Sequence, residues 1–326
     1  MNQAQSQAQL IALDWGTSSL RAYLLAGPEK VVESRQADWG IMHLPENGFA
    51  GALTSLCGDW LMQYPQLPIL AAGMVGSAQG WREAPYVETP ANVVDLALHL
   101  VTTAGPQGRP VHIAPGVIAG GLFPNVMRGE ETQILGALHL YPALTASDQE
   151  QLIVLPGTHS KWVKVQAGRI ENFTTFMTGE VYSALRQHTI LGRLMSYEED
   201  QDLERPSAFE RGLHVARDHP QSGVLSKLIS VRTLGLTNQL APTQLADYLS
   251  GLLIGYEIVE AILAFPDNVS SKAPPLILIG DKLLCERYRI AISHFGLSAD
   301  RDEIVDPTQA GLWHLASAAG LIPTAK

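Results

Sequence analysis

The sequence predicts an α/β protein made of two related lobes. Short apolar runs alternate with stretches in which apolar residues recur at helical spacing, which is typical of an α/β core. A Gly-Thr-x-Ser turn also occurs twice, as Gly16-Thr17-Ser18-Ser19 and as Gly157-Thr158-His159-Ser160, each time between two apolar runs. A chain of 326 residues is long for a single core. We therefore expect each turn to open one lobe.

The first lobe is expected over residues 1–146. Its first turn joins two short strands, and a helix follows in which Phe49, Leu53 and Trp60 lie on one side before Pro65 ends it. The expected strands are 10–13, 20–25, 67–73 and 111–114, the expected helices are 48–64, 93–101 and 130–140, and 115–125 is expected to be a loop.

The second lobe is expected over residues 147–326, because the stretch 142–151 is polar and poor in helix formers. The charged segment 196–222 is expected to form a loop and a helix. A small-residue helix near the C-terminus allows close packing and is a candidate hinge between the lobes. The expected strands are 152–155, 162–165, 170–175 and 276–279, and the expected helices are 178–191, 243–265, 282–294 and 309–320.

The chemistry of the two turns favours phosphate. Glycine lets the backbone approach a ligand, successive N–H groups form a concavity for an anion, and hydroxyl groups add donors. Asp14 precedes the first turn and can hold Mg²⁺ beside a polyphosphate, whereas Leu155 occupies the equivalent position in the second. The expected phosphate-binding residues are Gly16, Thr17, Ser18, Ser19, Gly157, Thr158, His159, Ser160 and Lys161. The alternatives are plain hairpin turns, a structural His159 and a surface Lys161.

The composition of the chain argues against some classes of binding partner. The net charge of −10 argues against a nucleic-acid partner, and no apolar run approaches the roughly 20 residues of a membrane helix. Cys57 and Cys285 lack metal-ligand spacing, and the first residues do not resemble a signal peptide. We therefore expect a cytoplasmic protein that binds a small molecule, with a homodimer left open.

The most informative stretches of the sequence are Asp14–Arg21, Gly73–Ser77, Gly80–Tyr86, Met127–Gln133, Leu155–Trp162, Met177–Glu180 and Leu278–Asp281. Together they resemble the superfamily of sugar kinases, actin and heat-shock-chaperone ATPases and, within it, the 2-dehydro-3-deoxygalactonokinase family. The resemblance covers almost the whole chain. It implies two ribonuclease-H-like lobes with mixed sheets and a nucleotide in the cleft between them. It also implies transfer of the γ-phosphoryl group of ATP, with Mg²⁺, to the 6-hydroxyl of 2-dehydro-3-deoxy-D-galactonate.

The resemblance also implies roles for individual residues. Glu130 is the expected catalytic base and Glu131 the second choice, although both could simply favour a helix start. Adenine is expected beside Gly280 and Asp281. Either Arg128 or Arg82 is expected to bind the substrate carboxylate. The other expected substrate residues are Trp81, Glu83, Tyr86 and Asn92, which could instead form an ordinary surface loop.

Other functions stay open on sequence grounds. Another sugar or sugar-acid kinase, such as a glucokinase-like enzyme, would share the same fold. An actin-like or chaperone-like ATPase would use the same turns for a different purpose, and so would a hydrolase of the exopolyphosphatase kind. The absence of an acidic residue at Leu155 argues against any mechanism that takes a metal ligand from the second turn.

Overall fold

The computed structural model describes residues 8–146, 148–196, 208–269, 273–300, 304 and 306–323. These residues form two compact units. The first unit contains the chain up to Glu150, Lys164–Phe173 and the chain from Asp306 onward, and the second contains Gln151–Val163 and Thr174–Val305. The boundary expected from the sequence, after residue 146, would place 164–173 and the last helix in the second unit. Both segments belong to the first unit instead. The hinge role of that helix stays a prediction.

The first unit is built on a six-stranded mixed sheet with the order β3-β2-β1-β4-β7-β6. β1 pairs antiparallel with β2 and parallel with β4, and β7 pairs parallel with β4 and antiparallel with β6. A smaller sheet has the order β5-β8-β9. The strands are β1 (Leu10–Trp15), β2 (Leu20–Gly27), β3 (Lys30–Ala37), β4 (Ile69–Ala72), β5 (Tyr86–Glu88), β6 (Val101–Ala104), β7 (Pro110–Ile113), β8 (Gly116–Ala119) and β9 (Asn125–Met127).

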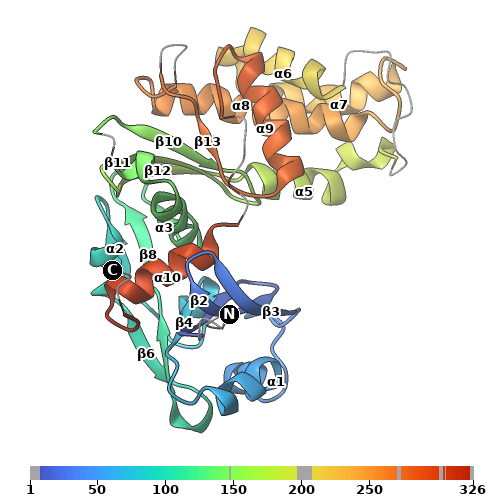
Figure 1. Ribbon diagram of the computed structural model, residues 1–326. Coiled ribbons are helices and arrows are strands. Elements are labelled where there is room, and N and C mark those ends of the chain that lie inside the picture. Colours follow the sequence, from blue (N-terminus) through green and yellow to red (C-terminus); the bar gives the residue numbers. More distant parts are fainter. Residues whose placement is uncertain are drawn as a thin grey trace, which may run out of the picture. The chain divides into compact units, whose positions relative to one another are not determined.

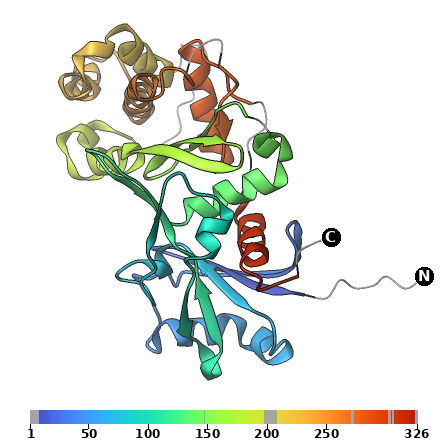
Figure 2. The ribbon, with the colours of Figure 1, turned by 90° about the vertical axis from the view of Figure 1, so that its left-hand side faces the viewer.

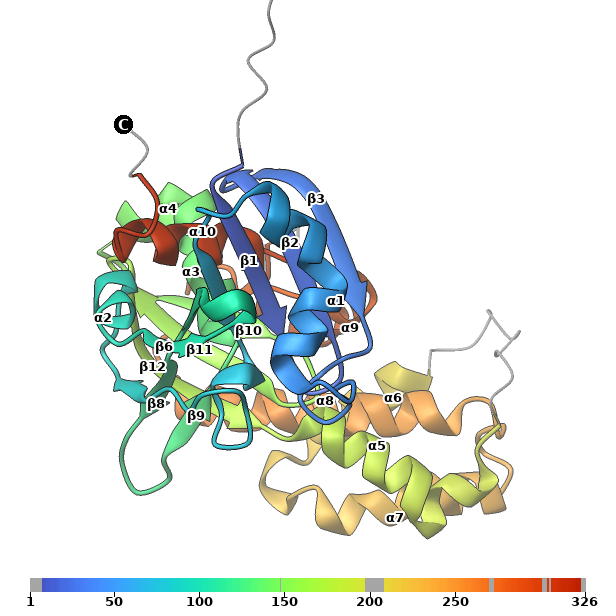
Figure 3. The ribbon, with the colours of Figure 1, turned by 90° about the horizontal axis from the view of Figure 1, so that it is seen from below.

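Alternation along β1 divides the large sheet into two faces. Ile11, Leu13 and Trp15 belong to a core that also contains Trp60 of helix α1. Leu10, Ala12 and Asp14 are therefore on the other face, toward the C-terminal helix α10 (Figure 3). The helices of this unit are α1 (Gly48–Gln63), α2 (Val93–Ala97), α3 (Glu130–Leu140), α4 (Pro142–Ala146) and α10 (Thr308–Ala318).

Helices α3 and α10 cross at two glycines, and they lie side by side in Figures 1 and 2. A Cβ atom on Gly311 would lie 1.8 Å from the carbonyl oxygen of Thr132, and one on Gly136 would lie 1.9 Å from that of Pro307. Backbone thus contacts backbone, and no larger residue fits at either position. This close contact explains why the small-residue helix packs within the first unit.

The second unit has the strand order β12-β11-β10-β13, with β10 and β13 parallel. Helices α6 to α9 gather on one side of these strands (Figure 1), and Trp162, Ile254, Leu278 and Tyr288 share their core. The far ends of β11 and β12 belong to the first unit. The elements are β10 (Gln151–Leu155), β11 (Ser160–Gln166), β12 (Arg169–Phe176), β13 (Ile277–Leu278), α5 (Thr178–His188), α6 (Ala208–Asp218), α7 (Leu225–Leu236), α8 (Leu245–Ala264) and α9 (Lys282–His294).

The predicted fold class is confirmed. Four strands in each unit follow the same spatial order, β3-β2-β1-β4 in the first and β12-β11-β10-β13 in the second. In both sets, the third strand along the chain lies at one edge, followed by the second, the first and the fourth. The two Gly-Thr-x-Ser turns join the first and second strands of each set, β1 to β2 and β10 to β11. None of the helices in the described ranges is both long and apolar enough to cross a bilayer.

Some elements differ from the expectation. Strand β8 and most of the hairpin to β9 lie inside the segment 115–125, which was expected to be a loop. Helix α2 ends at Ala97, before β6 begins at Val101, so the helix expected over 93–101 is shorter than predicted. Strand β3 and helix α7 have no counterpart among the predicted elements.

The α3–α10 crossing yields a stability prediction. We expect Gly311→Ala to lower the free energy of unfolding by about 3 kcal/mol, because the added methyl group meets a backbone carbonyl that cannot turn aside. Urea denaturation followed by circular dichroism measures the change. The matched control is Gly58→Ala in α1, where the nearest atom is Thr54 Cγ2 at 3.8 Å. That change should be neutral or stabilising by up to about 1 kcal/mol. Equal effects of the two substitutions would contradict the packing argument.

Candidate functional site

Asp14 lies near the end of β1, on the face that carries α10. Its register partner on β2 is Arg21. Arg21 Nη1 lies 3.9 Å from Asp14 Oδ2 and 3.7 Å from Asp306 Oδ2, so one guanidinium lies between two carboxylates. Asp306 lies two residues before α10, which begins at Thr308, and adopts a positive φ of 42°, a conformation uncommon for a residue other than glycine.

The surroundings of Asp14 oppose its charge. The pKa of Asp14 is raised to about 6. Burial is the largest cause, Arg21 opposes the rise, and the carboxylates of Asp306 and Glu130 add to it. Asp14 is thus influenced by two other carboxylates and by one guanidinium, which leaves an excess of acidic groups at this point. A cation bound here would remove that cost.

The first turn is fixed by the loop that follows β3. Gly16 N donates to Ser19 O at 3.0 Å, and Ile41 N donates to Gly16 O at 3.1 Å. A Cβ atom on Gly40 would lie 2.2 Å from Thr17 O, so this glycine allows the two backbones to meet. Thr17 and Ser18 are exposed at the tip. Their side chains are therefore available to a ligand.

Glu130 and Glu131 occupy the first turn of α3, where the helix dipole favours negative charge. Glu130 is partly exposed and accepts a bond from Arg128 N at 3.1 Å. Glu131 is fully buried, accepts a bond from Gly129 N at 2.6 Å, and has one carboxylate oxygen, Oε1, without a hydrogen-bond partner among the described residues. Burial, and then the nearby Glu130, raise the pKa of Glu131 to about 8. Glu131 is thus mostly protonated at neutral pH.

The predicted substrate residues fall into three groups. Trp81 and Asn92 have structural partners: Trp81 stacks on Phe49 at 5.6 Å between ring centroids, and Asn92 caps α2 through a capping box. Arg82 and Glu83 are exposed. The guanidinium of Arg128 lies over the ring of Tyr86, with its Cζ 4.4 Å from the ring centroid. Of these predicted residues, the structure brings Tyr86 and Arg128 together.

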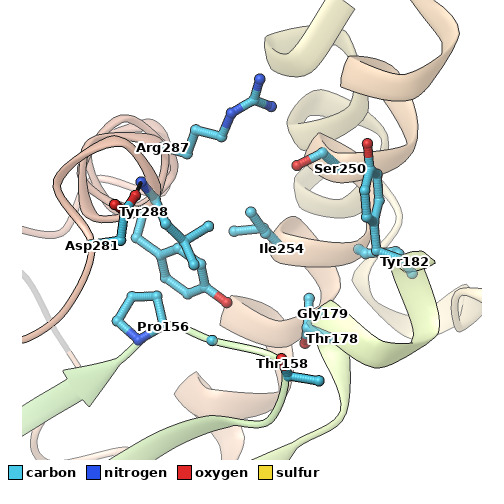
Figure 4. Close-up of a pocket in the computed structure, with 13 residues that line it drawn as sticks. Pro156, Thr158, Thr178, Gly179, Tyr182, Ser250, Ile254, Asp281, Arg287 and Tyr288 are labelled. Carbon is cyan, nitrogen blue, oxygen red and sulfur yellow. Dashed lines mark hydrogen bonds between the residues drawn. The ribbon is translucent and has the colours of Figure 1, made fainter. Parts of the chain in front are cut away.

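The second unit contains a cavity of about 500 Å³. Figure 4 shows Arg287 and Tyr288 of α9 on one side of it, Tyr182 of α5 and Ser250 of α8 on the other, and Thr158 and Gly179 near its floor. Apolar side chains of α8 and α9 supply much of its lining. The full lining is Pro156, Gly157, Thr158, Thr178, Gly179, Tyr182, Ser250, Leu253, Ile254, Asp281, Leu284, Arg287 and Tyr288.

The second turn contributes unequally to this cavity. Gly157 and Thr158 line it, and the exposed His159 pairs with Glu180. Ser160 and Lys161 are buried instead. Ser160 Oγ lies 2.8 Å from Tyr288 Oη, and Lys161 Nζ donates to His159 O at 3.1 Å. The expected phosphate contacts of these residues stay predictions.

A buried carboxylate, Glu257, is connected to this turn by hydrogen bonds. Glu257 accepts bonds from Trp162 Nε1 and from Tyr288 Oη, both at 2.8 Å. Because Tyr288 also contacts Ser160, the network ties the turn to α8 and α9. Burial raises the pKa of Glu257, and the hydrogen bonds from its neighbours oppose that rise. The network therefore holds the floor of the cavity in place.

Gly280 and Asp281 lie at the start of α9, as the sequence predicts. Gly280 has a φ of 145°, and Asp281 caps α9 by accepting a bond from Leu284 N at 3.0 Å. Asp281 also lines the cavity. The turn is thus placed to contact a ligand there.

Sequence reasoning missed several residues of these two sites. Asp306 lies just before the predicted C-terminal helix and was not among the predicted site residues. Ser250 and Arg287 are single polar positions on helices. Their spacing from Ile254 and Leu284 places each on the face that lines the cavity, but the sequence does not show that these two faces meet.

The donor set around Asp14 is compatible with Mg²⁺. Across the described ranges, no three His, Cys, Asp or Glu side chains come close enough to hold a metal ion by themselves. Mg²⁺ is usually held by one or two carboxylates, substrate phosphates and its own waters. A single carboxylate in a region of excess negative charge fits that mode of binding.

Comparison with known proteins identifies the family. The profile of the 2-keto-3-deoxy-galactonokinase family matches residues 14–315. The chain belongs to this family. It is 33% identical over 312 residues to the 2-dehydro-3-deoxygalactonokinase of Escherichia coli K12, covering 95% of this chain and 98% of the relative. It is 35% identical over 303 residues to a protein of Rhizobium meliloti described as a probable 2-dehydro-3-deoxygalactonokinase, covering 92% and 94%.

A solved structure agrees with this 2-keto-3-deoxy-galactonokinase assignment. The crystal structure of a candidate 2-dehydro-3-deoxygalactonokinase from Sinorhizobium meliloti superposes with a TM-score of 0.80 at 33% identity, covering 95% of this chain and 98% of that one. The match extends over both compact units. The resemblance inferred from the motifs is confirmed.

The raised pKa of Asp14 predicts that the charge of this side chain lowers the stability of this galactonokinase-family chain. Its pKa is higher in the folded state than the ordinary value of 3.8, so between pH 4 and 6 the folded state binds more protons than the unfolded state. The free energy of unfolding therefore falls as the pH rises through that window. At pH 7 and without ligands, we expect Asp14→Asn to be more stable than the wild type by about 1–3 kcal/mol.

Urea denaturation at pH 7 and at pH 4 in the presence of EDTA measures this difference, which should shrink at the lower pH. Glu46→Gln, which removes an exposed carboxylate, is the matched control and should change little. An Asp14→Asn protein that is less stable at pH 7 would contradict the electrostatic argument.

Proposed function

We propose that this protein transfers the γ-phosphoryl group of ATP to the 6-hydroxyl of 2-dehydro-3-deoxy-D-galactonate, in the breakdown of galactonate. Membership of the 2-keto-3-deoxy-galactonokinase family carries the proposal. The two turns, the cavity beside the second turn and the acidic group beside the first turn support it, because phosphoryl transfer requires mainly alignment and neutralisation of charge.

We assign the adenosine part of ATP to the cavity of the second unit. Ile254, Leu253 and Leu284 offer apolar contacts to a base, and the hydroxyl groups of Ser250 and Thr178 offer hydrogen bonds. Gly157 has no neighbouring atom within 4 Å of the Cβ position, so a phosphate group can approach its backbone. Thr158 adds a hydroxyl beside it.

We assign Mg²⁺ to Asp14. The ion would supply positive charge to the phosphate oxygens as negative charge shifts during transfer. Asp14 would hold it directly or through its waters, and Arg21 would keep the carboxylate in place. Thr17 and Ser18 at the exposed tip would donate to the phosphates.

We assign the base to Glu130. It is partly exposed and belongs to the same electrostatic group as Asp14. Glu131 is buried, and its pKa of about 8 keeps it protonated at neutral pH, which is unsuitable for a base. Glu130 would accept the proton of the attacking hydroxyl. Glu131 would then position the start of α3 through its bond from Gly129 N.

The proposed setting is the cytoplasm. Both cysteines, Cys57 and Cys285, are buried and free, which is compatible with a reducing compartment. The sugar-acid acceptor would be a metabolite of the cytoplasm.

The function is tested by coupled ADP release with ATP and a panel of acceptors. We expect turnover with 2-dehydro-3-deoxy-D-galactonate and little with neutral hexoses. The phosphorylated product should carry the new ester on carbon 6, as nuclear magnetic resonance would establish. Turnover with glucose and none with the keto-deoxy acid would favour a glucokinase-like activity. ADP release without any acceptor would favour an ATPase.

The two glutamates can be separated by isosteric substitution. We expect Glu130→Gln to lower kcat by about 10²–10⁴-fold while the KM for ATP stays nearly the same, because a general base is lost. Glu131→Gln should have a much smaller effect, since its side chain is already neutral at pH 7. Steady-state kinetics at pH 7 measures both. The reverse pattern would assign the base to Glu131.

A further inference from the structure

Three buried polar atoms on Arg128 and Ser77 lack hydrogen-bond partners among the described residues. They are Arg128 Nε, Arg128 Nη1 and Ser77 Oγ, each screened from solvent and without a partner among the described residues. Leaving such atoms unpaired is costly, most of all on a charged group. Buried donors without a partner in the folded protein therefore indicate that a bound ligand accepts their hydrogen bonds.

The surrounding residues hold the guanidinium in a fixed position. Arg128 Nη2 donates to Ala84 O at 2.9 Å, and the ring of Tyr86 stacks against the guanidinium at 4.4 Å. Two glycines make the space for this arrangement. A Cβ atom on Gly76 would lie 2.9 Å from Arg128 Nη1, and one on Gly116 would lie 2.6 Å from the Tyr86 ring. Larger residues at these positions would displace the two side chains.

Ser77 belongs to the loop that contacts this guanidinium. The residue before it, Gly76, lies against Arg128 Nη1, and Gly76 O accepts a bond from Ala84 N at 2.9 Å. Ser77 N donates to Met74 O at 3.0 Å, which fixes the backbone that carries the hydroxyl. The residue that carries this hydroxyl thus directly follows the glycine that lies against the fixed guanidinium. Planar guanidinium and hydroxyl donors together suit a carboxylate.

We propose that Arg128 and Ser77 bind the carboxylate of the sugar-acid acceptor and that Tyr86 turns aside to admit it. Tyr86 is 41% exposed, so its ring can leave the guanidinium for solvent. This inference rests on the proposed function and names the residues that select an acid over a neutral sugar. It also distinguishes between the two arginines, because Arg82 is exposed and offers no built site.

Ser77→Ala tests the hydroxyl. We expect the dissociation constant of the keto-deoxy acid, measured by calorimetry, to rise about tenfold, with the KM for ATP unchanged. The thermal midpoint of the free protein should be unchanged or higher, because the substitution removes a buried group that lacks a partner. Ser55→Ala on the exposed side of α1 is the control. Lower stability with unchanged affinity would assign Ser77 a structural water instead and overturn its role.

Charge selection is tested with a second acceptor, the primary amide of the same acid, which keeps the hydroxyl groups and loses the charge. We expect the ratio of kcat/KM for the acid to kcat/KM for the amide to fall at least about tenfold in Arg128→Lys, because the lysine is a point charge without the planar fork. The same fall in Arg82→Lys, with none in Arg128→Lys, would overturn the assignment.

These outcomes separate the inference from the proposed function. A wild-type protein that phosphorylates neither acceptor would contradict the function. A wild-type protein that prefers the acid, with variants of Arg128 and Ser77 that keep the same preference, would contradict only the carboxylate site.

Discussion

The close contact between α3 and α10 is the constraint on which the first site depends. Gly136 and Gly311 let the backbones of the two helices touch, and this fixes where both helices begin. Helix α3 begins at Glu130, and Asp306 lies two residues before the first residue of α10. The carboxylates of both residues raise the pKa of Asp14, so the helix starts bring negative charge to the end of β1. The packing of these two helices therefore contributes to the electrostatics of the site.

The buried carboxylates Glu257 and Glu131 have different surroundings. In the second unit, Glu257 is buried but receives hydrogen bonds from Trp162 and Tyr288, so its network supports the structure. In the first unit, Glu131 and Arg128 keep buried atoms that no described residue satisfies, and Asp14 is held beside other carboxylates. Such arrangements lower stability and are typical of places where a ligand completes the interactions.

The sequence predicted the elements that local pattern controls. The helices at 130–140 and 282–294 have the predicted bounds, and both turns join the strands that were expected. Strand β3 was missed because most of it is exposed and it exists through pairing with β2, so it shows no clear apolar alternation. Strand β8 was missed because it is short and pairs with β5, about thirty residues earlier in the chain. The stacking of Arg128 on Tyr86 depends on the same pairing, and no spacing rule reveals it.

The order of segments in the first unit has a consequence for how the protein is made. This unit is assembled from the beginning of the chain, from Lys164–Phe173 and from the segment after Asp306, with the second unit encoded between them. A ribosome therefore releases the whole of the second unit before it supplies α10. Domains generally fold as they emerge during synthesis, so the second unit can fold while the first still waits for its last helix. A nascent chain that stops short of α10 would leave the β1 sheet uncovered on the face that carries Asp14.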